Sequence, residues 1–261
     1  MGGTHPQLEL GQQSVEVNSF YIDRTAVTNR AFRQYVRATK FKTESEDFGW
    51  SFVLDNDASD QARQYSQGSP EGAPQWLAIS QAYWRKPNGP GSGIKDKLDY
   101  PVVHVSYNDA KAYCKWKGMR LPTETEWEFA ARGGLSEQPY SWGSDLLGDG
   151  GEWKMNIWQG DFPKHNEAED GFASLAPADA FEPNAYGLYN MLGNVWEWCA
   201  TKYDRDQVRF LFNKELAVSL VQVFVLRVNV VNVGVLCSRS AFFAEDHILT
   251  VQRVTSTMQQ T

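Results

Sequence analysis

Hydrophobic and polar residues follow two different periods in the first part of the chain. Residues 15–23 alternate between apolar and polar positions, which predicts a β-strand. A helix is predicted soon after it, with Thr28 or Asn29 as its N-cap. The inner face of that helix is predicted to carry Phe32, Tyr35 and Val36. The chain therefore begins with a strand followed by an amphipathic helix.

Two further helices are marked by reciprocal capping pairs. Ser106 is followed three residues later by Asp109. Thr123 is followed at the same spacing by Glu126, and this helix is predicted to end at the glycine pair 133–134. The inner face of the earlier helix is predicted to carry Ala110, Tyr113 and Cys114.

The stretches between these elements have no clear period. Residues 42–100 mix Gly, Pro, Ser and Asp with large aromatic residues, so we expect an ordered loop rather than a disordered segment. Residues 135–200 contain short aromatic segments broken by Gly, Pro and Asn. We therefore predict a single α+β domain of low regular secondary-structure content over residues 1–204.

The character of the sequence changes near residue 205, and residues 205–261 are predicted to form a divergent tail. Within it, residues 216–236 form a valine-rich run that approaches the length needed to cross a bilayer. The run is interrupted by Gln222, Arg227, Asn229 and Asn232. Because polar residues at these depths are costly in lipid, a buried strand pair or an unstructured tail is favoured over a membrane span.

Composition and charge narrow the function classes. Aromatic residues make up 13% of the 261 residues, with ten tryptophans, which suits a fold built from packed loops. The net charge of −7, together with the absence of RNP, zinc-finger and basic-helix patterns, argues against nucleic-acid binding. The three cysteines form no CxxC motif and show no zinc spacing with histidine.

Several ordered blocks carry more specific information. They are residues 48–53 (Phe-Gly-Trp-Ser-Phe-Val), 91–94, 101–110, 120–128 (Arg-Leu-Pro-Thr-Glu-Thr-Glu-Trp-Glu), 156–160 (Asn-Ile-Trp-Gln-Gly), 169–172, 186–190 and 193–198. Their order over roughly residues 15–200 resembles the formylglycine-generating enzyme, or sulfatase-modifying factor, family. Three segments, residues 48–53, 89–94 and 127–134, resemble the non-catalytic branch of the family, sulfatase-modifying factor 2. Ala131 stands where the active enzyme has a cysteine.

The resemblance implies a C-type lectin-like fold with two calcium sites. The first would use Asn156, Asp170 and the carbonyls of Ile157 and Phe172. The second would use Asn190, Glu197 and the carbonyls of Gly193 and Val195. These are the hard oxygen donors that Ca²⁺ prefers, and neither set contains the thiolate or imidazole typical of zinc or copper. The alternative is that the asparagines are turn residues and Glu197 is a surface charge.

The family's oxidation chemistry would require a pair of cysteine thiolates that bind copper(I). Residues 225–227 match the start of the corresponding family segment, and Val228-Asn229 then departs from it as a translated intron would. Residues 237–240 (Cys-Ser-Arg-Ser) resemble the active enzyme's Cys-His-Arg-Ser-Tyr-Cys in part, but Phe242 stands where the second cysteine belongs and the flanking residues do not match. We therefore expect no copper and an unpaired Cys237 thiol.

Two further residues have open interpretations. The resemblance implies that Cys114 would bond to a cysteine in a closing block that this chain lacks. We expect Cys114 to remain a buried thiol, with a bridge to Cys199 or Cys237 left open. His104 could be a catalytic base, but no serine or cysteine motif accompanies it, so a packed, hydrogen-bonded histidine is favoured.

Three functions follow from these patterns. The resemblance favours a non-catalytic protein of the endoplasmic reticulum lumen that binds sulfatases or the active generating enzyme, with a homodimer or heterodimer left open. The alternatives are an oxidoreductase acting through Cys237, and a lectin-like module that binds a peptide or glycan in a tryptophan-rich groove. The first residues contain no signal peptide, which we attribute to an incomplete start rather than to a cytosolic protein.

Overall fold

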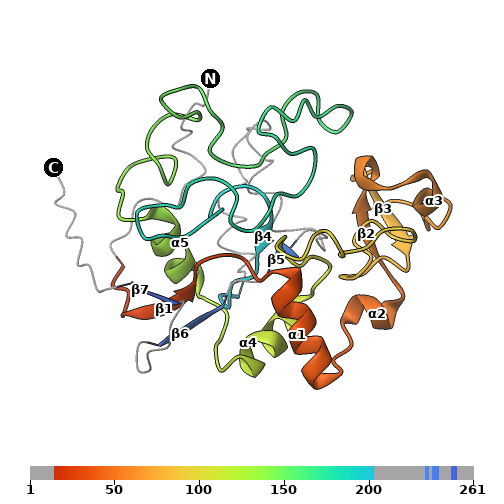
Figure 1. Ribbon diagram of the computed structural model, residues 1–261, viewed down its shortest axis with the longest axis horizontal. Coiled ribbons are helices and arrows are strands. Elements are labelled where there is room, and N and C mark those ends of the chain that lie inside the picture. Colours follow the sequence, from red (N-terminus) through yellow and green to blue (C-terminus); the bar gives the residue numbers. More distant parts are fainter. Residues whose placement is uncertain (1–14, 203–232, 235–236, 241–247, 252–261) are drawn as a thin grey trace.

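The computed structural model describes residues 15–202, 233–234, 237–240 and 248–251. It has short helices and strands joined by long packed loops (Figure 1). The helices are α1 (Asn29–Thr39), α2 (Glu44–Phe48), η1 (Asp55–Asp57), α3 (Asp60–Arg63), α4 (Tyr107–Trp116) and α5 (Glu124–Arg132). The strands are β1 (Phe20–Asp23), β2 (Trp50–Leu54), β3 (Trp76–Ser80), β4 (Trp196–Glu197), β5 (Val233–Gly234), β6 (Ser238–Ser240) and β7 (Ile248–Val251). Within these described ranges, no helix is long and apolar enough to cross a membrane.

The three predicted helices are confirmed, with the caps that the sequence indicates. The Thr28 hydroxyl accepts from the Ala31 amide at the start of α1. α4 and α5 both begin with a complete capping box, in which the cap side chain and the acidic side chain three residues later satisfy each other's backbone amides. Gly133 ends α5 with a φ of 59°, a conformation that glycine adopts without steric cost.

The prediction of an ordered loop over residues 42–100 is only partly correct. β2 and β3 form an antiparallel pair in which Trp50 lies opposite Ser80 and Leu54 opposite Trp76. Two short helices, α2 and α3, flank this pair on the right of Figure 1. Each strand has only five residues, and the segment between them is long, so neither a clear alternation nor a hairpin turn was visible.

The last strands pair with the first one. β6 and β7 both run antiparallel to β1, one on each side, giving the order β6-β1-β7. β1 covers only the second half of the strand predicted at 15–23. β5 pairs with β4 in parallel, and the rest of the valine-rich run 216–236 lies outside the described residues. The proposed boundary at residue 204 stays a prediction.

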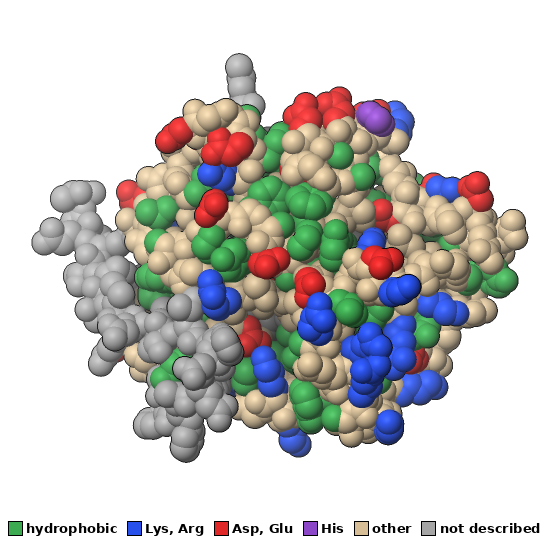
Figure 2. All heavy atoms as spheres, viewed as in Figure 1, with side chains coloured by type: hydrophobic (Ala, Val, Ile, Leu, Met, Phe, Trp, Pro, Cys, Tyr) green, Lys and Arg blue, Asp and Glu red, His purple; other side chains and the backbone are tan. Residues whose placement is uncertain are grey.

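The main core lies between α1, α4 and the loop before α4. Phe32 packs with its ring centroid 5.2 Å from that of Trp84 and 5.7 Å from that of Tyr113. A second cluster lies under α5 against β1, and a third lies between α3 and the β2–β3 pair. On the face shown in Figure 2, basic side chains gather toward the lower right and acidic ones along the upper edge.

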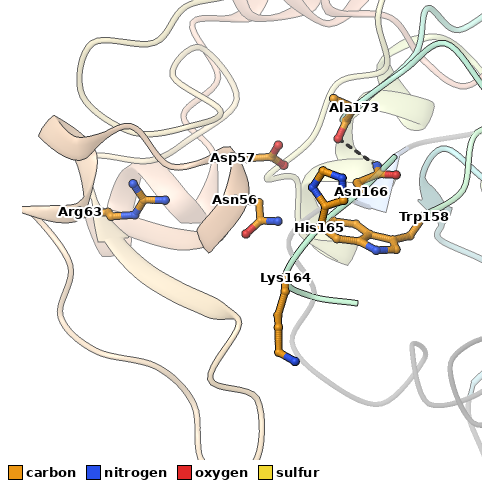
Figure 3. A pocket seen from close by; sticks show the side chains of 8 residues that line it. All are labelled: Asn56, Asp57, Arg63, Trp158, Lys164, His165, Asn166 and Ala173. Atoms are coloured by element: carbon orange, nitrogen blue, oxygen red, sulfur yellow. Dashed lines mark hydrogen bonds between the residues drawn. The ribbon is translucent and has the colours of Figure 1, made fainter. Parts of the chain in front are cut away.

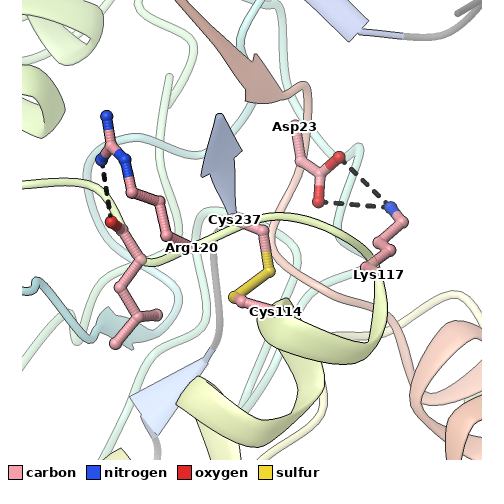
Figure 4. The surroundings of a disulfide bond; sticks show 6 residues. Asp23, Cys114, Lys117, Arg120 and Cys237 are labelled. Atoms are coloured by element: carbon pink, nitrogen blue, oxygen red, sulfur yellow. Dashed lines mark hydrogen bonds and ion pairs between the residues drawn. A yellow bond between two sulfur atoms is a disulfide. The ribbon is translucent and has the colours of Figure 1, made fainter. Parts of the chain in front are cut away.

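A disulfide between Cys114 and Cys237 joins α4 to the segment that leads into β6 (Figure 4). The expectation that Cys114 stays a thiol and that Cys237 is unpaired is wrong, and of the two bridges left open for Cys114 the structure contains the one to Cys237. The two Cα atoms lie 5.7 Å apart, and the Cys237 carbonyl accepts from the Asp23 amide at the end of β1 at 3.0 Å. Strand pairing thus brings a cysteine of the tail onto the buried face of α4, a contact that no local pattern reveals.

Candidate metal centre

Three loops meet at the residues predicted to bind calcium. Asn194 joins them: its Oδ1 accepts from Asn156 Nδ2 at 3.0 Å and from the Ala176 amide at 2.9 Å. The Asn194 amide in turn donates to the Asn156 carbonyl at 2.8 Å. Gly193 has a φ of 76°, and a Cβ at this position would collide with the same carbonyl. Only glycine allows this close approach.

The structure brings the first predicted set together. The Asp170 carboxylate accepts from the Ile157 amide at 2.9 Å through Oδ2. Its Oδ1 accepts from the Phe172 amide at 2.8 Å. Asn156 directly precedes Ile157, and both Asn156 and Asp170 are buried. The residues expected to supply four calcium ligands therefore lie around one carboxylate.

Gln159 belongs to this cluster and was not predicted. Its Nε2 donates to the Asp170 carboxylate at 2.9 Å and also to the Ile157 carbonyl. Its Oε1 is buried without a hydrogen-bond partner. The side chain thus reaches two of the predicted ligand positions. The sequence signal for Gln159 was its position in the Asn-Ile-Trp-Gln-Gly block, close to two predicted ligands. A glutamine buried there needs polar partners, and these ligands are the nearest ones.

The second predicted set is less closely joined. Asn190, at a φ of 50°, donates through Nδ2 to the carbonyls of Pro177 at 3.1 Å and Ala178 at 3.0 Å. Its Oδ1 is buried and unpaired. The Glu197 carboxylate accepts from Trp127 Nε1 at 2.6 Å. The hydrogen bonds of these two ligand candidates therefore lead to different neighbours, while Gly193 and Val195 lie on the backbone between them.

The donor chemistry of both sets suits a hard cation. The unpaired Asn190 Oδ1 is a buried oxygen that a cation could satisfy. Burial raises the pKa of Glu197 to about 7, although the hydrogen bond from the Trp127 N–H lowers it in part. A nearby cation would favour the charged form of this carboxylate. In the described part of the chain, no three His, Cys, Asp or Glu side chains are grouped so that they could hold a metal ion together. Each predicted set has only one carboxylate, so calcium binding stays a prediction.

His104 is a packed, hydrogen-bonded histidine, as favoured from the sequence. It is 5% exposed, with Nδ1 2.9 Å from Ser51 Oγ and Nε2 2.6 Å from the Pro87 carbonyl. Burial lowers the pKa of His104 to about 4. Ser51 is the partner that the sequence did not reveal, because it lies far away in the chain on β2.

The cysteines are not arranged as a metal-binding pair. Cys114 and Cys237 are both fully buried in the main core cluster and are joined to each other. Cys199 is half-buried, and burial beside Glu197 and two other glutamates raises the pKa of its thiol to about 12. A thiol with so high a pKa is almost entirely protonated at neutral pH, so it is a poor ligand and nucleophile.

The chain is similar in sequence to proteins of one known family. A family model described as the sulfatase-modifying factor enzyme 1-like domain matches residues 1–246. The chain is 53% identical over 192 residues to the inactive C-alpha-formylglycine-generating enzyme 2 of Bos taurus, a match that covers 73% of this chain and 62% of that protein. It is 50% identical over 211 residues to a formylglycine-generating enzyme of Thermomonospora curvata, covering 79% and 69% of the two chains.

The similarity is partial in length. The match to the Mus musculus inactive enzyme 2 is 53% identical and covers 73% of this chain and 61% of that protein. The chain thus spans less than two thirds of these two inactive relatives. Among solved structures, PvdO from Pseudomonas aeruginosa matches with a TM-score of 0.49 and 25% identity, over 76% of this chain and 66% of that one.

Proposed function

Because the chain belongs to the family of sulfatase-modifying factor enzyme 1-like domains, we propose that it is a non-catalytic, calcium-binding member of this family. It binds sulfatases or the active generating enzyme and moderates the formation of formylglycine. The inactive relatives from Bos taurus and Mus musculus, each 53% identical, support this choice. The low regular secondary-structure content is compatible with the C-type lectin-like fold that the resemblance implies.

The state of the cysteines is the observation that carries the proposal. The whole chain has three cysteines, and two of them form the Cys114–Cys237 disulfide. Only Cys199 is left, so the chain in this state cannot offer two thiolates to copper(I). Oxidation of a substrate cysteine by the family's chemistry would therefore lack its metal site.

Calcium has a structural role in this proposal. The first site would be held by Asp170, Asn156 and the carbonyls of Ile157 and Phe172, and the second by Asn190, Glu197 and two backbone carbonyls. When bound, Ca²⁺ supplies fixed positive charge that links oxygens from separate loops. The hydrogen bonds around Asp170 and the unpaired Asn190 Oδ1 support this assignment.

The endoplasmic reticulum lumen is the proposed location. The Cys114–Cys237 disulfide supports an oxidising compartment, because structural disulfides are rare in the cytosol. Partner binding in that compartment would involve newly made sulfatases.

The test uses the full chain in calcium-containing buffer with a peptide carrying the Cys-x-Pro-x-Arg pattern. We expect saturable binding by calorimetry and no mass change in the peptide after incubation with copper(I), oxygen and a thiol reductant that leaves the disulfide intact. A scrambled peptide of the same composition is the binding control. Formation of formylglycine would refute the non-catalytic assignment, and equal binding of both peptides would refute the partner assignment.

One observation favours a second candidate, an oxidoreductase. Cys114 and Cys237 are neighbours, so reduction would place two thiols side by side. Both are fully buried, however, and no substrate thiol could reach them without opening the core. Repeating the peptide assay after complete reduction separates the two candidates, because only the oxidoreductase predicts conversion that disappears in a Cys114→Ser variant.

A further inference from the structure

A polar pocket of about 370 Å³ lies between the segment from η1 to α3 and the loop 158–173 (Figure 3). It is lined by Asn56, Asp57, Arg63, Trp158, Lys164, His165, Asn166 and Ala173. Asn56 Nδ2 donates to the Pro163 carbonyl at 2.9 Å, which ties the two walls together. Asn166 fixes the loop from within, accepting from the Gln159 amide at 3.1 Å and donating to the Ala173 carbonyl at 3.3 Å.

The pocket contains both a hydrogen-bond donor and an acceptor that a ligand could use. Trp158 Nε1 is buried and has no partner, although a buried indole N–H normally has one. The Trp158 ring is held edge-on against Phe162, with centroids 5.1 Å apart. Across the space, Asp57 supplies a carboxylate that also bonds to Ser174. Its pKa is raised, chiefly by burial, so its charge would gain from additional donors.

The charges around the pocket disfavour an ionic ligand. Arg63 is already paired with Asp55 at 2.8 Å and with Asp60 at 2.9 Å. Lys164 is paired with Asp161 at 3.0 Å. These basic groups would repel a bound cation, and the neighbouring carboxylates would repel an anion. A neutral ligand rich in hydrogen-bonding groups avoids both penalties.

We propose that this pocket binds a neutral, hydroxyl-rich ring of the carbohydrate class. A sugar ring carries several hydroxyls that each accept and donate, so separate hydroxyls can serve Trp158 Nε1 and the Asp57 carboxylate. The C–H face of a pyranose can pack on the indole ring. The volume lies near the lower end of the roughly 300–1,000 Å³ typical of small-molecule pockets, which suits one or two rings. The inference is independent of the peptide partner proposed above.

In the experiment, the full chain is titrated with four neutral sugars: glucose, mannose, galactose and N-acetylglucosamine. Binding is measured by saturation-transfer NMR. Two variants probe the pocket: Asp57→Asn keeps the side-chain shape and removes the charge, and Trp158→Phe keeps an aromatic ring and removes the N–H. Trp142→Phe is the matched control, because Trp142 Nε1 donates to the Asp145 carbonyl and does not line the pocket. Circular dichroism checks that each variant is folded.

We expect at least one sugar to bind saturably, and each pocket variant to weaken its affinity about tenfold, the effect of one well-formed hydrogen bond. The Trp142→Phe variant should bind like the parent. No binding of any sugar to the folded parent would overturn the proposal, as would unchanged affinity in both pocket variants. Tighter binding of inorganic sulfate or of a lysine peptide would overturn the neutral-ligand assignment. Peptide binding by the same samples shows separately whether the proposed function holds.

Discussion

The helical base of the molecule and its loop-rich half are held together in different ways. The base, formed by α1, α4 and the strand β1, has stacked aromatic rings, a covalent cross-link and few unpaired polar groups. The half that contains residues 155–197 has almost no regular structure and depends on side-chain amides that bridge separate backbone segments. Among the described residues, three of the four buried side-chain N or O atoms without a partner belong to this half: Trp158 Nε1, Gln159 Oε1 and Asn190 Oδ1.

This difference indicates where ligands should act. The base has one such unpaired atom, Asn29 Oδ1, among its described residues, so it gains less from a bound ion or sugar than loops that contain several unpaired oxygens and N–H groups. We therefore expect changes in the base to alter stability regardless of ligands, and changes in the loops to alter ligand-dependent stability.

The largest expected effect is the loss of the disulfide. Cys237→Ser should lower the free energy of unfolding by about 4–5 kcal/mol, because the bond closes a loop of 123 residues in the unfolded chain. The measurement is denaturant unfolding without reductant. Cys199→Ser is the control, since Cys199 is unpaired, and it should lose much less. Equal losses in the two variants would contradict a structural disulfide.

The next effect is a pH dependence from His104. Burial lowers its pKa from 6.5 to about 4, so the unfolded chain binds a proton that the folded chain does not. This contribution is fully present above pH 6.5 and is lost as the pH falls through 4, by up to about 3 kcal/mol. Asp109, whose pKa burial raises to about 6, acts with the opposite sign.

The His104→Asn variant isolates this contribution, because asparagine tolerates the φ of 58° at this position and does not titrate. Asp109 is present in both proteins. Unfolding between pH 4 and 7 should show a smaller loss of stability on acidification in the variant than in the parent. Parallel curves would show that His104 is not the titrating group.

Calcium should stabilise the loops by an amount comparable to the His104 contribution, and this stabilisation should be present only when calcium is bound. At about 100 times its Kd, a site that exists only in the folded chain adds about 2.7 kcal/mol. Asn190→Ala should remove most of the stabilisation that calcium gives through the second site. Asn184→Ala is the matched control, because Asn184 Oδ1 already accepts from the Tyr186 and Leu188 amides. It should lower stability equally with calcium and with chelator.

Thermal unfolding in calcium and in chelator measures both variants. If Asn190→Ala keeps the parent's full response to calcium, the second site is wrongly assigned. If calcium does not stabilise the parent protein either, both calcium sites are wrongly assigned.

The smallest expected effect is the loss of a helix cap in the base. Ser106→Ala removes the hydroxyl that accepts from the Asp109 amide at 3.1 Å at the start of α4 and should cost about 1 kcal/mol. Because the change lies in the base, the loss should be the same in calcium and in chelator. A calcium-dependent loss would break the distinction between the two halves.

The sequence predicted best what depends on neighbours three or four residues apart. The caps at Thr28, Ser106 and Thr123 are local patterns, and each lies where it was expected. The pairing of β1 with β6 and β7, and the disulfide it allows, join residues more than 100 positions apart, so no period contains them. At the candidate metal centre, the ligand sets came from family resemblance, while Gln159 and Asn194 appeared only once the loops were folded.

A count of free thiols tests the central claim most directly. The full chain is denatured without reductant, alkylated, digested and analysed by mass spectrometry. We predict alkylation of Cys199 alone and a linked peptide pair containing Cys114 and Cys237. Alkylation of all three cysteines would contradict the account, because two neighbouring thiols would then be available to bind copper(I).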